Sequence, residues 1–278
     1  MSAAATPAAA AGVDAVAAPG PEGHRFLFIC GVHRSGTSIV HRVLRDHPEV
    51  SGFTGTGAPE DEGQHLQSVF LPAKRYGGPG RFGFDPRAHL TEDSPLATPA
   101  AAARLWREWS RHWELDRAVL AEKSPPNLLR MRFLQACFPA SYFLVVTRHP
   151  VAAAYATQAF TRRRWRKWRQ QPVAAHLRHW FHCHRIFQAD RPHVRNLMVL
   201  RYEDFAARPQ EAADRVAAFV GLAPAPVRME VRGGTNDRYL AQWRRDLAHW
   251  WRGPALRRAA AEYEAEAAAY GYTLVDPS

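Results

Sequence analysis

The chain has 278 residues, of which 46% are hydrophobic and 23% charged, and it carries a formal net charge of +11. This length suits one α/β domain, and no segment approaches the roughly 18 uninterrupted apolar residues of a membrane span. Three cysteines, Cys30, Cys137 and Cys183, lie far apart and form no C-x-x-C motif. They predict free, buried thiols in a reducing compartment, and therefore a cytoplasmic protein.

Residues 1–24 differ in composition from the rest of the chain. They consist mostly of Ala, Pro and Gly, and prolines and glycines interrupt them repeatedly. They lack the basic start of a signal peptide and are too broken for a membrane span. We expect a disordered tail over residues 1–24 and a single domain over residues 25–278.

The remaining residues alternate between strand and helix patterns. Short apolar runs predict strands at residues 26–30, 118–122, 142–147 and 197–200, with a short extended piece at 50–53. Periodic apolar residues predict helices at residues 38–46, 99–113, 126–137, 150–160, 172–189, 209–221 and 254–270. The glycine-rich residues 54–98 predict loops. This alternation predicts an α/β fold of the P-loop kind, with helices on both faces of one parallel sheet and ligands at the carboxyl ends of its strands.

The first predicted strand leads into a candidate anion site. It ends at Gly31, and a helical pattern begins at Ser38. Backbone N–H groups of such a loop, together with the helix dipole, favour a negative charge. The glycine spacing, with a second glycine at Gly36, matches the P-loop motif G-x-x-x-x-G-K-[ST], but Thr37 occupies the lysine position. The positive charge lies instead at Arg34, which argues against a nucleotide γ-phosphate and for a different phosphate ligand.

This loop resembles the one that binds the 5′-phosphosulfate of 3′-phosphoadenosine 5′-phosphosulfate (PAPS) in sulfotransferases. The family motif typically reads P-[KR]-[SA]-G-T-[TS]. The chain has histidine where proline is common and then matches the motif, reading His33, Arg34, Ser35, Gly36, Thr37 and Ser38. The resemblance implies that residues 34–38 bind the 5′-phosphosulfate of the donor, and it places Arg34 among the catalytic residues.

A second family feature lies at Arg148, directly after the predicted strand 142–147. In sulfotransferases an arginine at this place binds the 3′-phosphate of PAPS, and the guanidinium suits that task because it binds phosphate bidentately and stays charged. The family usually has a serine eight residues later. Here that position is Ala156, so Thr157 is the candidate substitute.

Three further segments extend the resemblance. Residues 122–125, Glu-Lys-Ser-Pro, resemble the E-K-[ST]-P motif of glycosaminoglycan and related sulfotransferases, which implies that Lys123 stabilises charge on the departing phosphate oxygen. Tyr202 lies in a segment resembling [LV]-x-Y-E-[DQ]-[LF], whose tyrosine lies near the adenine. The loop that begins at Arg232 and Gly233 resembles one that folds over the nucleotide.

Sulfuryl transfer also requires a base that takes the proton of the acceptor. The resemblance is closer to the tyrosylprotein and glycosaminoglycan type, which uses glutamate, than to the cytosolic type, which uses histidine. In glutamate-using members the base follows the phosphate loop. Glu62 is our first candidate, Glu60 the second and His65 the third. Alternatively, these acids cap a helix over residues 64–71.

A dense basic run with two tryptophans occupies residues 162–169. Such a run is typical of single-stranded nucleic-acid binding, of binding to a membrane surface, of a rim that attracts an anionic substrate, or of a solvated helix end. The histidines of the predicted helix 172–189 lack an acidic partner, so we expect no metal site.

Together these features predict a PAPS-dependent sulfotransferase that releases 3′,5′-ADP (PAP) and acts on a hydroxyl or an amine. The acceptor, whether a small molecule, a glycan or a phenol, stays open, as does the oligomeric state. Two alternatives are a P-loop kinase or NTPase and a nucleic-acid-binding protein built around residues 162–169, although we expect no nucleic-acid partner.

Overall fold

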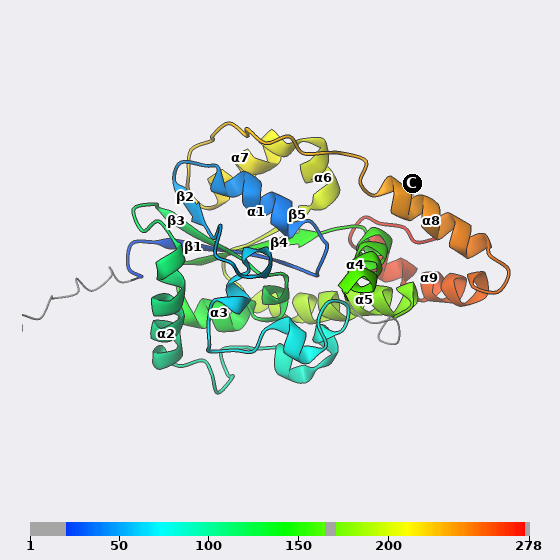
Figure 1. The fold of residues 1–278 in the computed structure, drawn as a ribbon, viewed down its shortest axis with the longest axis horizontal. Helices are drawn as coiled ribbons and strands as arrows, with labels where there is room; N and C mark the ends of the chain where they lie inside the picture. Colours follow the sequence, from blue (N-terminus) through cyan, green and yellow to red (C-terminus); the bar gives the residue numbers. More distant parts are fainter. Residues whose placement is uncertain (1–20, 165–170, 276–278) are drawn as a thin grey trace, which may run out of the picture.

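The computed structural model describes residues 21–164 and 171–275. Within them lies a five-stranded sheet with the order β2-β3-β1-β4-β5, in which every neighbouring pair is parallel (Figure 1). The strands are β1 (Arg25–Gly31), β2 (Val50–Gly52), β3 (Val119–Lys123), β4 (Ser141–Thr147) and β5 (Leu197–Arg201). This confirms the predicted α/β class and the predicted parallel sheet.

The strand register brings the carboxyl ends of four strands to one edge of the sheet. Ile29 of β1 lies opposite Lys123 of β3, and Thr147 of β4 lies opposite Arg201 of β5. The loops that follow β1, β3, β4 and β5 therefore meet at this edge. It is the edge at which a parallel sheet binds its ligands.

Helices cover both faces of the sheet because side chains alternate along the strands. From β1, Leu27 and Ile29 pack into one apolar cluster and Phe26 and Phe28 into another. The first cluster lies under α1 (Thr37–Arg45), α6 (Tyr202–Ala207) and α7 (Pro209–Phe219). The second contains side chains of α2 (Pro99–Trp109), α3 (Met131–Cys137) and α5 (Val173–Asp190). Figure 1 shows these two sets of helices on opposite sides of the sheet.

Three more helices extend the molecule beyond the end of the sheet (Figure 1). Helix α4 packs against α5 and α8, and α8 packs against α9. Their bounds are α4 (Pro150–Arg164), α8 (Asp237–Ala248) and α9 (Gly253–Ala268). Among the described residues, no helix is long and apolar enough to cross a bilayer.

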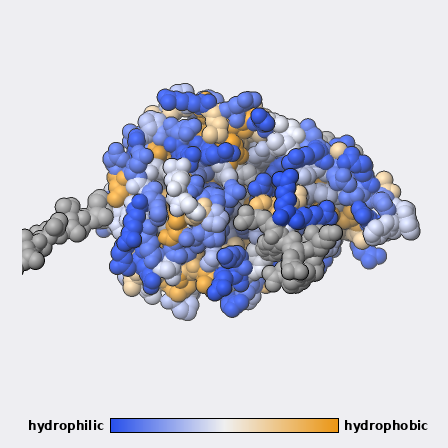
Figure 2. Space-filling model, in the orientation of Figure 1, coloured by the Kyte–Doolittle hydropathy of each residue, from blue (hydrophilic) through white to orange (hydrophobic). Residues whose placement is uncertain are grey.

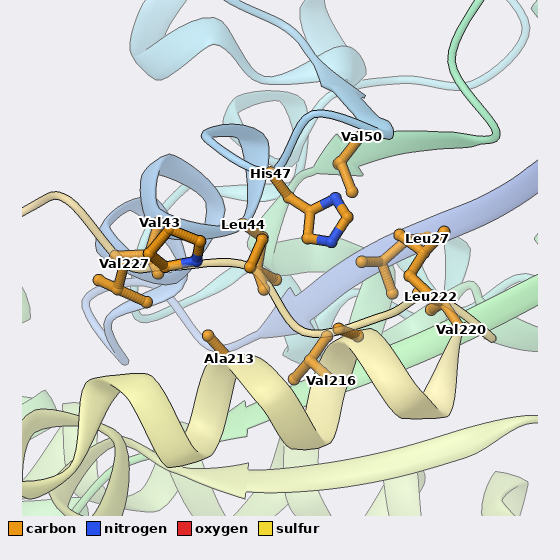
Figure 3. Close-up of a pocket in the computed structure, with 13 residues that line it drawn as sticks. Leu27, Val43, Leu44, His47, Val50, Ala213, Val216, Val220, Leu222 and Val227 are labelled. Carbon is orange, nitrogen blue, oxygen red and sulfur yellow. The ribbon is translucent and has the colours of Figure 1, made fainter.

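A small apolar cavity lies between α1 and α7, lined by Leu44, Val216 and neighbouring aliphatic side chains (Figure 3). Its volume of about 20 Å³ is close to that of one solvent-sized probe. The cavity is therefore a packing void in the core and lies away from the strand ends that carry the candidate site residues.

Some predicted elements differ from the observed ones. The predicted helix 99–113 ends at Trp109, and a 3₁₀ turn follows it. The predicted helix 126–137 begins instead as a 3₁₀ turn, Pro125–Leu129, before α3. The alternative helix over residues 64–71 is absent, because this segment forms only the short 3₁₀ turn Gly63–His65 among irregular described residues. Most of the predicted tail lies outside the described residues.

Candidate active site

The loop after β1, residues 32–36, is the predicted phosphate loop and forms a compact turn that leads into α1. The Ser35 backbone N–H and hydroxyl both donate to the Val32 carbonyl, at 3.2 and 2.8 Å. Arg34 has a φ of 69°, a left-handed conformation that costs energy in a non-glycine residue. No side chain of the described residues caps α1, whose first turn also lacks an acidic residue. The N–H groups at this helix start are therefore suited to an anion.

Gly36 is the N-terminal cap of α1 and has a φ of 102°. A Cβ atom at Gly36 would collide with the ring of Tyr202, which lies directly against the loop. The Tyr202 hydroxyl is 2.9 Å from the hydroxyl of Thr235. Tyr202 therefore joins the phosphate loop to the segment that includes Arg232 and Gly233.

Arg148 connects three segments at the end of β4. Its guanidinium donates to the carbonyl of Arg34 at 2.9 Å and to Asn236 Oδ1 at 2.8 Å. It also lies 4.7 Å from the centre of the Tyr202 ring, a cation–π contact. Only 7% of Arg148 is exposed, and burial lowers the pKa of its guanidinium. An arginine held this way presents a fixed, desolvated positive charge beside the phosphate loop.

The Glu203 carboxylate supports the position of Arg148 by holding Asn236, which contacts Arg148. Glu203 accepts hydrogen bonds from Asn236 Nδ2 at 2.6 Å, from the His149 backbone N–H at 3.0 Å and from the Tyr272 hydroxyl at 2.9 Å. Glu203 thereby orients Asn236, which in turn orients Arg148. The motif that drew attention to Tyr202 also contains Glu203, which is the signal that could have revealed this role.

An open cleft of about 310 Å³ lies beside these residues. Tyr202, Gly233, Thr235 and Asn236 line it, together with the segment 271–273. Pockets that hold small molecules start at about this size. The cleft therefore has room for part of a small molecule, and neither Arg148 nor any of residues 34–38 lines it.

Thr157 and Arg232 are two further residues predicted to bind the donor, and Thr157 is buried whereas Arg232 is exposed. The Thr157 hydroxyl is buried and donates to the carbonyl of His33 at 3.2 Å, so it supports the phosphate loop. Ala156 is also buried. Arg232 is exposed, and it is Gly233 next to it that lines the cleft. The guanidinium of Arg34 lies 5.5 Å from the ring centre of Phe160 on the exposed side of the loop.

The carboxyl end of β3 carries a buried ion pair. Lys123 is fully buried, and its ammonium donates to Glu62 Oε1 at 3.2 Å and to the Glu60 carbonyl at 2.8 Å. Glu62 is 7% exposed. Burial raises the pKa of the Glu62 carboxyl, and the charge of Lys123 acts in the opposite direction. An ammonium has three donors, so Lys123 keeps one beyond these two contacts.

The segment that carries Glu62 bends back onto the phosphate loop. Glu60 and Asp61 have φ values of 56° and 49°, so two consecutive non-glycine residues adopt the left-handed conformation. This bend places the Glu60 carboxylate 3.4 Å from the Ser38 hydroxyl, in the first turn of α1. His65 lies 4.0 Å from Glu62, and burial lowers the pKa of its ring. All three candidate bases therefore lie near Lys123.

Glu122 holds this segment in place. Its carboxyl group is fully buried and accepts hydrogen bonds from Gly63 N at 2.8 Å, from Ser124 Oγ at 2.5 Å and from Asn127 Nδ2. Burial raises the pKa of Glu122 to about 7. We did not assign Glu122 a role from sequence, although an acidic residue inside an apolar strand is a signal that could have revealed one.

The basic run at residues 162–169 is only partly described. Arg162 and Arg163 are exposed near the end of α4. Residues 165–170 lie outside the described part of the chain, so the predicted rim is not placed.

Comparison with known families identifies the protein class. A family model described as "Sulfotransferase family" matches residues 27–226, so the chain belongs to the sulfotransferase family. This confirms the resemblance predicted from the motifs and leaves the kinase and nucleic-acid alternatives without support. The match does not distinguish the glutamate type from the histidine type.

The solved structures that the chain matches include several sulfotransferases. One from Alicyclobacillus acidocaldarius is 20% identical, with a TM-score of 0.43 over 84% of this chain and 95% of that one. One from Mycobacterium avium is 16% identical, with a TM-score of 0.49 over 90% and 77%. A mouse sulfotransferase in complex with PAP is 12% identical, with a TM-score of 0.42 over 73% and 61%. A comparison with curated proteins found no match.

Proposed function

We propose that this sulfotransferase transfers the sulfuryl group of PAPS to a hydroxyl or amine by in-line displacement. The observation that carries the proposal is the convergence of two positive groups on one uncapped helix start. Arg148 donates a hydrogen bond to the Arg34 carbonyl in the phosphate loop. Lys123 donates to the Glu60 carbonyl, and the Glu60 carboxylate accepts from the Ser38 hydroxyl in the first turn of α1. Two separated anionic groups of one ligand suit this arrangement.

The donor would occupy these groups as follows. Residues 34–38 would bind the 5′-phosphosulfate at the start of α1, and Arg148 would bind the 3′-phosphate. Tyr202 would contact the adenine beside the cleft, which Gly233 also lines, and the exposed Arg232 would contact the nucleotide from the same segment. The hydroxyl of Thr157, which donates to the loop backbone, would act on the 3′-phosphate only through the loop.

The Lys123–Glu62 pair would supply the chemistry. Glu62 would take the proton of the acceptor as the acceptor oxygen or nitrogen forms its bond to sulfur and the bond from sulfur to the phosphate oxygen breaks. The remaining donor of Lys123 would stabilise the negative charge that develops on the leaving PAP. Glu60 and His65 are the second and third candidates for the base. A cytoplasmic location, with Cys30, Cys137 and Cys183 as free thiols, completes the proposal.

The test compares two nucleotides by thermal unfolding. PAP at about 100 times its dissociation constant should add about 2.7 kcal/mol of stability, whereas ATP with Mg²⁺ should add little. Stabilisation by ATP with Mg²⁺ and none by PAP would contradict the proposed donor. A screen of alcohols, phenols, amines and glycans with labelled PAPS then identifies the acceptor class.

A further inference from the structure

Two adjacent tryptophans are exposed where α8 meets α9. Trp250 is 84% exposed and Trp251 58% exposed, although tryptophan is usually well buried. By contrast, Trp243 in α8 is fully buried and donates to the Leu274 carbonyl at 2.7 Å. Figure 1 shows the junction of α8 and α9 at the far end of the molecule, opposite α2. We call residues 249–252 the tryptophan tip.

The tip is a tight turn rather than a loose loop. The Gly253 N–H donates to the His249 carbonyl at 2.8 Å, and a Cβ at Gly253 would collide with the Leu247 carbonyl. The centre of the His249 ring lies 6.4 Å from the ring centre of Trp250 and 5.6 Å from the ring centre of Trp251. The backbone of this turn is therefore closed by a hydrogen bond, and both exposed indoles stand on it.

Positive charge surrounds the tryptophan tip. Residues 240–258 contain one acid, Asp246, whose carboxylate accepts hydrogen bonds from the Tyr155 hydroxyl and from Gln242. Figure 2 shows hydrophilic side chains gathered over α8. The same residues contain five arginines, all of them exposed, namely Arg244, Arg245, Arg252, Arg257 and Arg258.

We propose that the tryptophan tip docks the protein onto an anionic lipid surface. Indole rings favour the interface between membrane and water, where the ring is buried and its N–H stays solvated. Arginines around an inserted tip bind anionic headgroups, and the formal net charge of +11 favours approach to such a surface. This surface lies outside the groups proposed for sulfuryl transfer, so the inference does not depend on them.

Other occupants fit the tip less well. Proteins that bind single-stranded nucleic acid hold it along a basic groove with stacking platforms, whereas these indoles lie on a projecting turn. A second copy docked tip to tip would bring two sets of five arginines together, and the like charges would repel. The combination of projecting indoles and arginines therefore favours a lipid surface.

The test measures binding of the full chain to vesicles by co-sedimentation. Vesicles of equal parts phosphatidylglycerol and phosphatidylcholine should bind the protein, and vesicles of phosphatidylcholine alone should bind it far less. Replacing both tip tryptophans, Trp250→Ala and Trp251→Ala, should lower the partition coefficient at least about tenfold. Replacing both by Phe should retain more binding than replacing both by Ala.

A charge-matched pair of variants isolates the role of position. Arg244→Gln with Arg252→Gln should lower binding about 25-fold, since each basic residue near an anionic surface contributes roughly fivefold. Arg107→Gln with Arg111→Gln removes the same charge from exposed positions in α2 and in the turn that follows it. Because α2 lies at the opposite end of the molecule (Figure 1), this pair should change binding much less. Added salt should reduce the difference between the pairs.

Several outcomes would overturn the inference. They are no binding to anionic vesicles at low salt, equal losses for the two arginine pairs, and binding that is insensitive to the tryptophans. Loss of a dimer in the tryptophan variant, without vesicle binding, would identify a second copy as the occupant. Binding to single-stranded DNA that requires the tip, again without vesicle binding, would identify nucleic acid. Because both tryptophans are exposed, unchanged melting temperatures should confirm that the variants fold.

Discussion

A buried carboxylate beside a buried ammonium is the central residue-scale feature of the site. Removing one partner of such a pair leaves an uncompensated charge, so Glu62 and Lys123 depend on each other. The raised pKa of Glu62 makes its carboxylate a better proton acceptor than an exposed glutamate. The charge of Lys123 acts against this rise in the pKa of Glu62.

We expect Glu62→Gln to lower kcat about 10²–10⁴-fold, because the amide cannot accept the proton. PAP affinity should stay near that of the wild type. In the wild type, kcat/KM should fall as the pH falls through the raised pKa of Glu62, because protonation removes the base. Steady-state kinetics against pH and calorimetry with PAP measure both effects.

Glu60→Gln and His65→Asn are the controls for this assignment. If either one abolishes turnover while Glu62→Gln stays active, the base is that neighbour. If all three variants are active, the base lies outside this segment.

Arg148 presents the second residue-scale prediction. Arg148→Ala should weaken PAP binding by about 2–3 kcal/mol, because a charge-assisted bidentate contact is lost. Affinity for 5′-AMP should change much less, since AMP has no 3′-phosphate. Arg148→Lys keeps the charge but not the planar donors and should give an intermediate loss. Equal losses for PAP and AMP in calorimetry would mean that Arg148 acts only by holding the Arg34 carbonyl and Asn236.

At the scale of elements, the carboxyl end of β3 fixes the segment that carries the candidate base. The Glu122 carboxyl holds Gly63, and the Ser124 hydroxyl accepts from the Gln64 backbone N–H at 3.0 Å. The Trp109 indole of α2 donates to the Gly63 carbonyl at 3.0 Å. A strand end and a helix therefore hold both sides of one turn, which limits the positions that Glu62 can occupy.

Glu122 also predicts a dependence of stability on pH. Its pKa is about 7 in the folded protein and near 4.5 when unfolded, so the folded state binds the proton more tightly. The stabilisation is complete below about pH 4.5 and is lost as the pH rises to about 7. This one group should lower the free energy of unfolding by roughly 3 kcal/mol across that range.

Glu122→Gln should remove this contribution. Urea unfolding at pH 5 and pH 8 measures the difference for both proteins, and other titrating groups cancel between them. The wild type should lose about 3 kcal/mol more than the variant on going from pH 5 to pH 8. An identical pH difference in the two proteins would show that Glu122 does not carry a raised pKa.

Element boundaries were harder to predict than element types. Every predicted strand is present within a residue or two, because buried strands have short apolar runs. Helix α8 was missed, since its buried residues Leu240 and Trp243 are surrounded by charged and polar side chains. Its amphipathic pattern becomes meaningful only when α4 and α9 pack against it.

At the scale of the whole molecule, buried histidines link folding to pH. Burial lowers the pKa of these side chains, to about 3 for His41 and His184 and to about 4 for His149 and His176. The unfolded chain therefore binds protons that the folded chain does not. Their contribution to stability is complete above pH 6.5 and is lost as the pH falls toward 4.

Acidification should therefore unfold the protein cooperatively between pH 6.5 and 4. Near pH 5.5 these four histidines favour the uptake of up to about four protons on unfolding, and Glu122 offsets up to one. These four histidines and Glu122 should together lower the free energy of unfolding by roughly 4 kcal/mol per pH unit, and His33 and His179, whose pKa burial also lowers, should steepen the fall. Unfolding in urea at closely spaced pH values measures this slope. A flat profile over this range would contradict the assignment of neutral, buried histidines.

The amino-acid sequence alone predicted the α/β class and the sulfotransferase family, which the parallel sheet and the family match confirm, and its site assignments stay predictions. These signals are local, because the strand, the glycine-containing loop and the helix start are contiguous in the chain. Neighbouring residues therefore set their backbone preferences. Tertiary structure decided the pairings. Lys123 and Glu62 are 61 positions apart, and Arg148 and the Arg34 carbonyl are 114 apart. Such contacts depend on which strand ends meet at one edge of the sheet and on how deeply they are buried, and no local pattern encodes either.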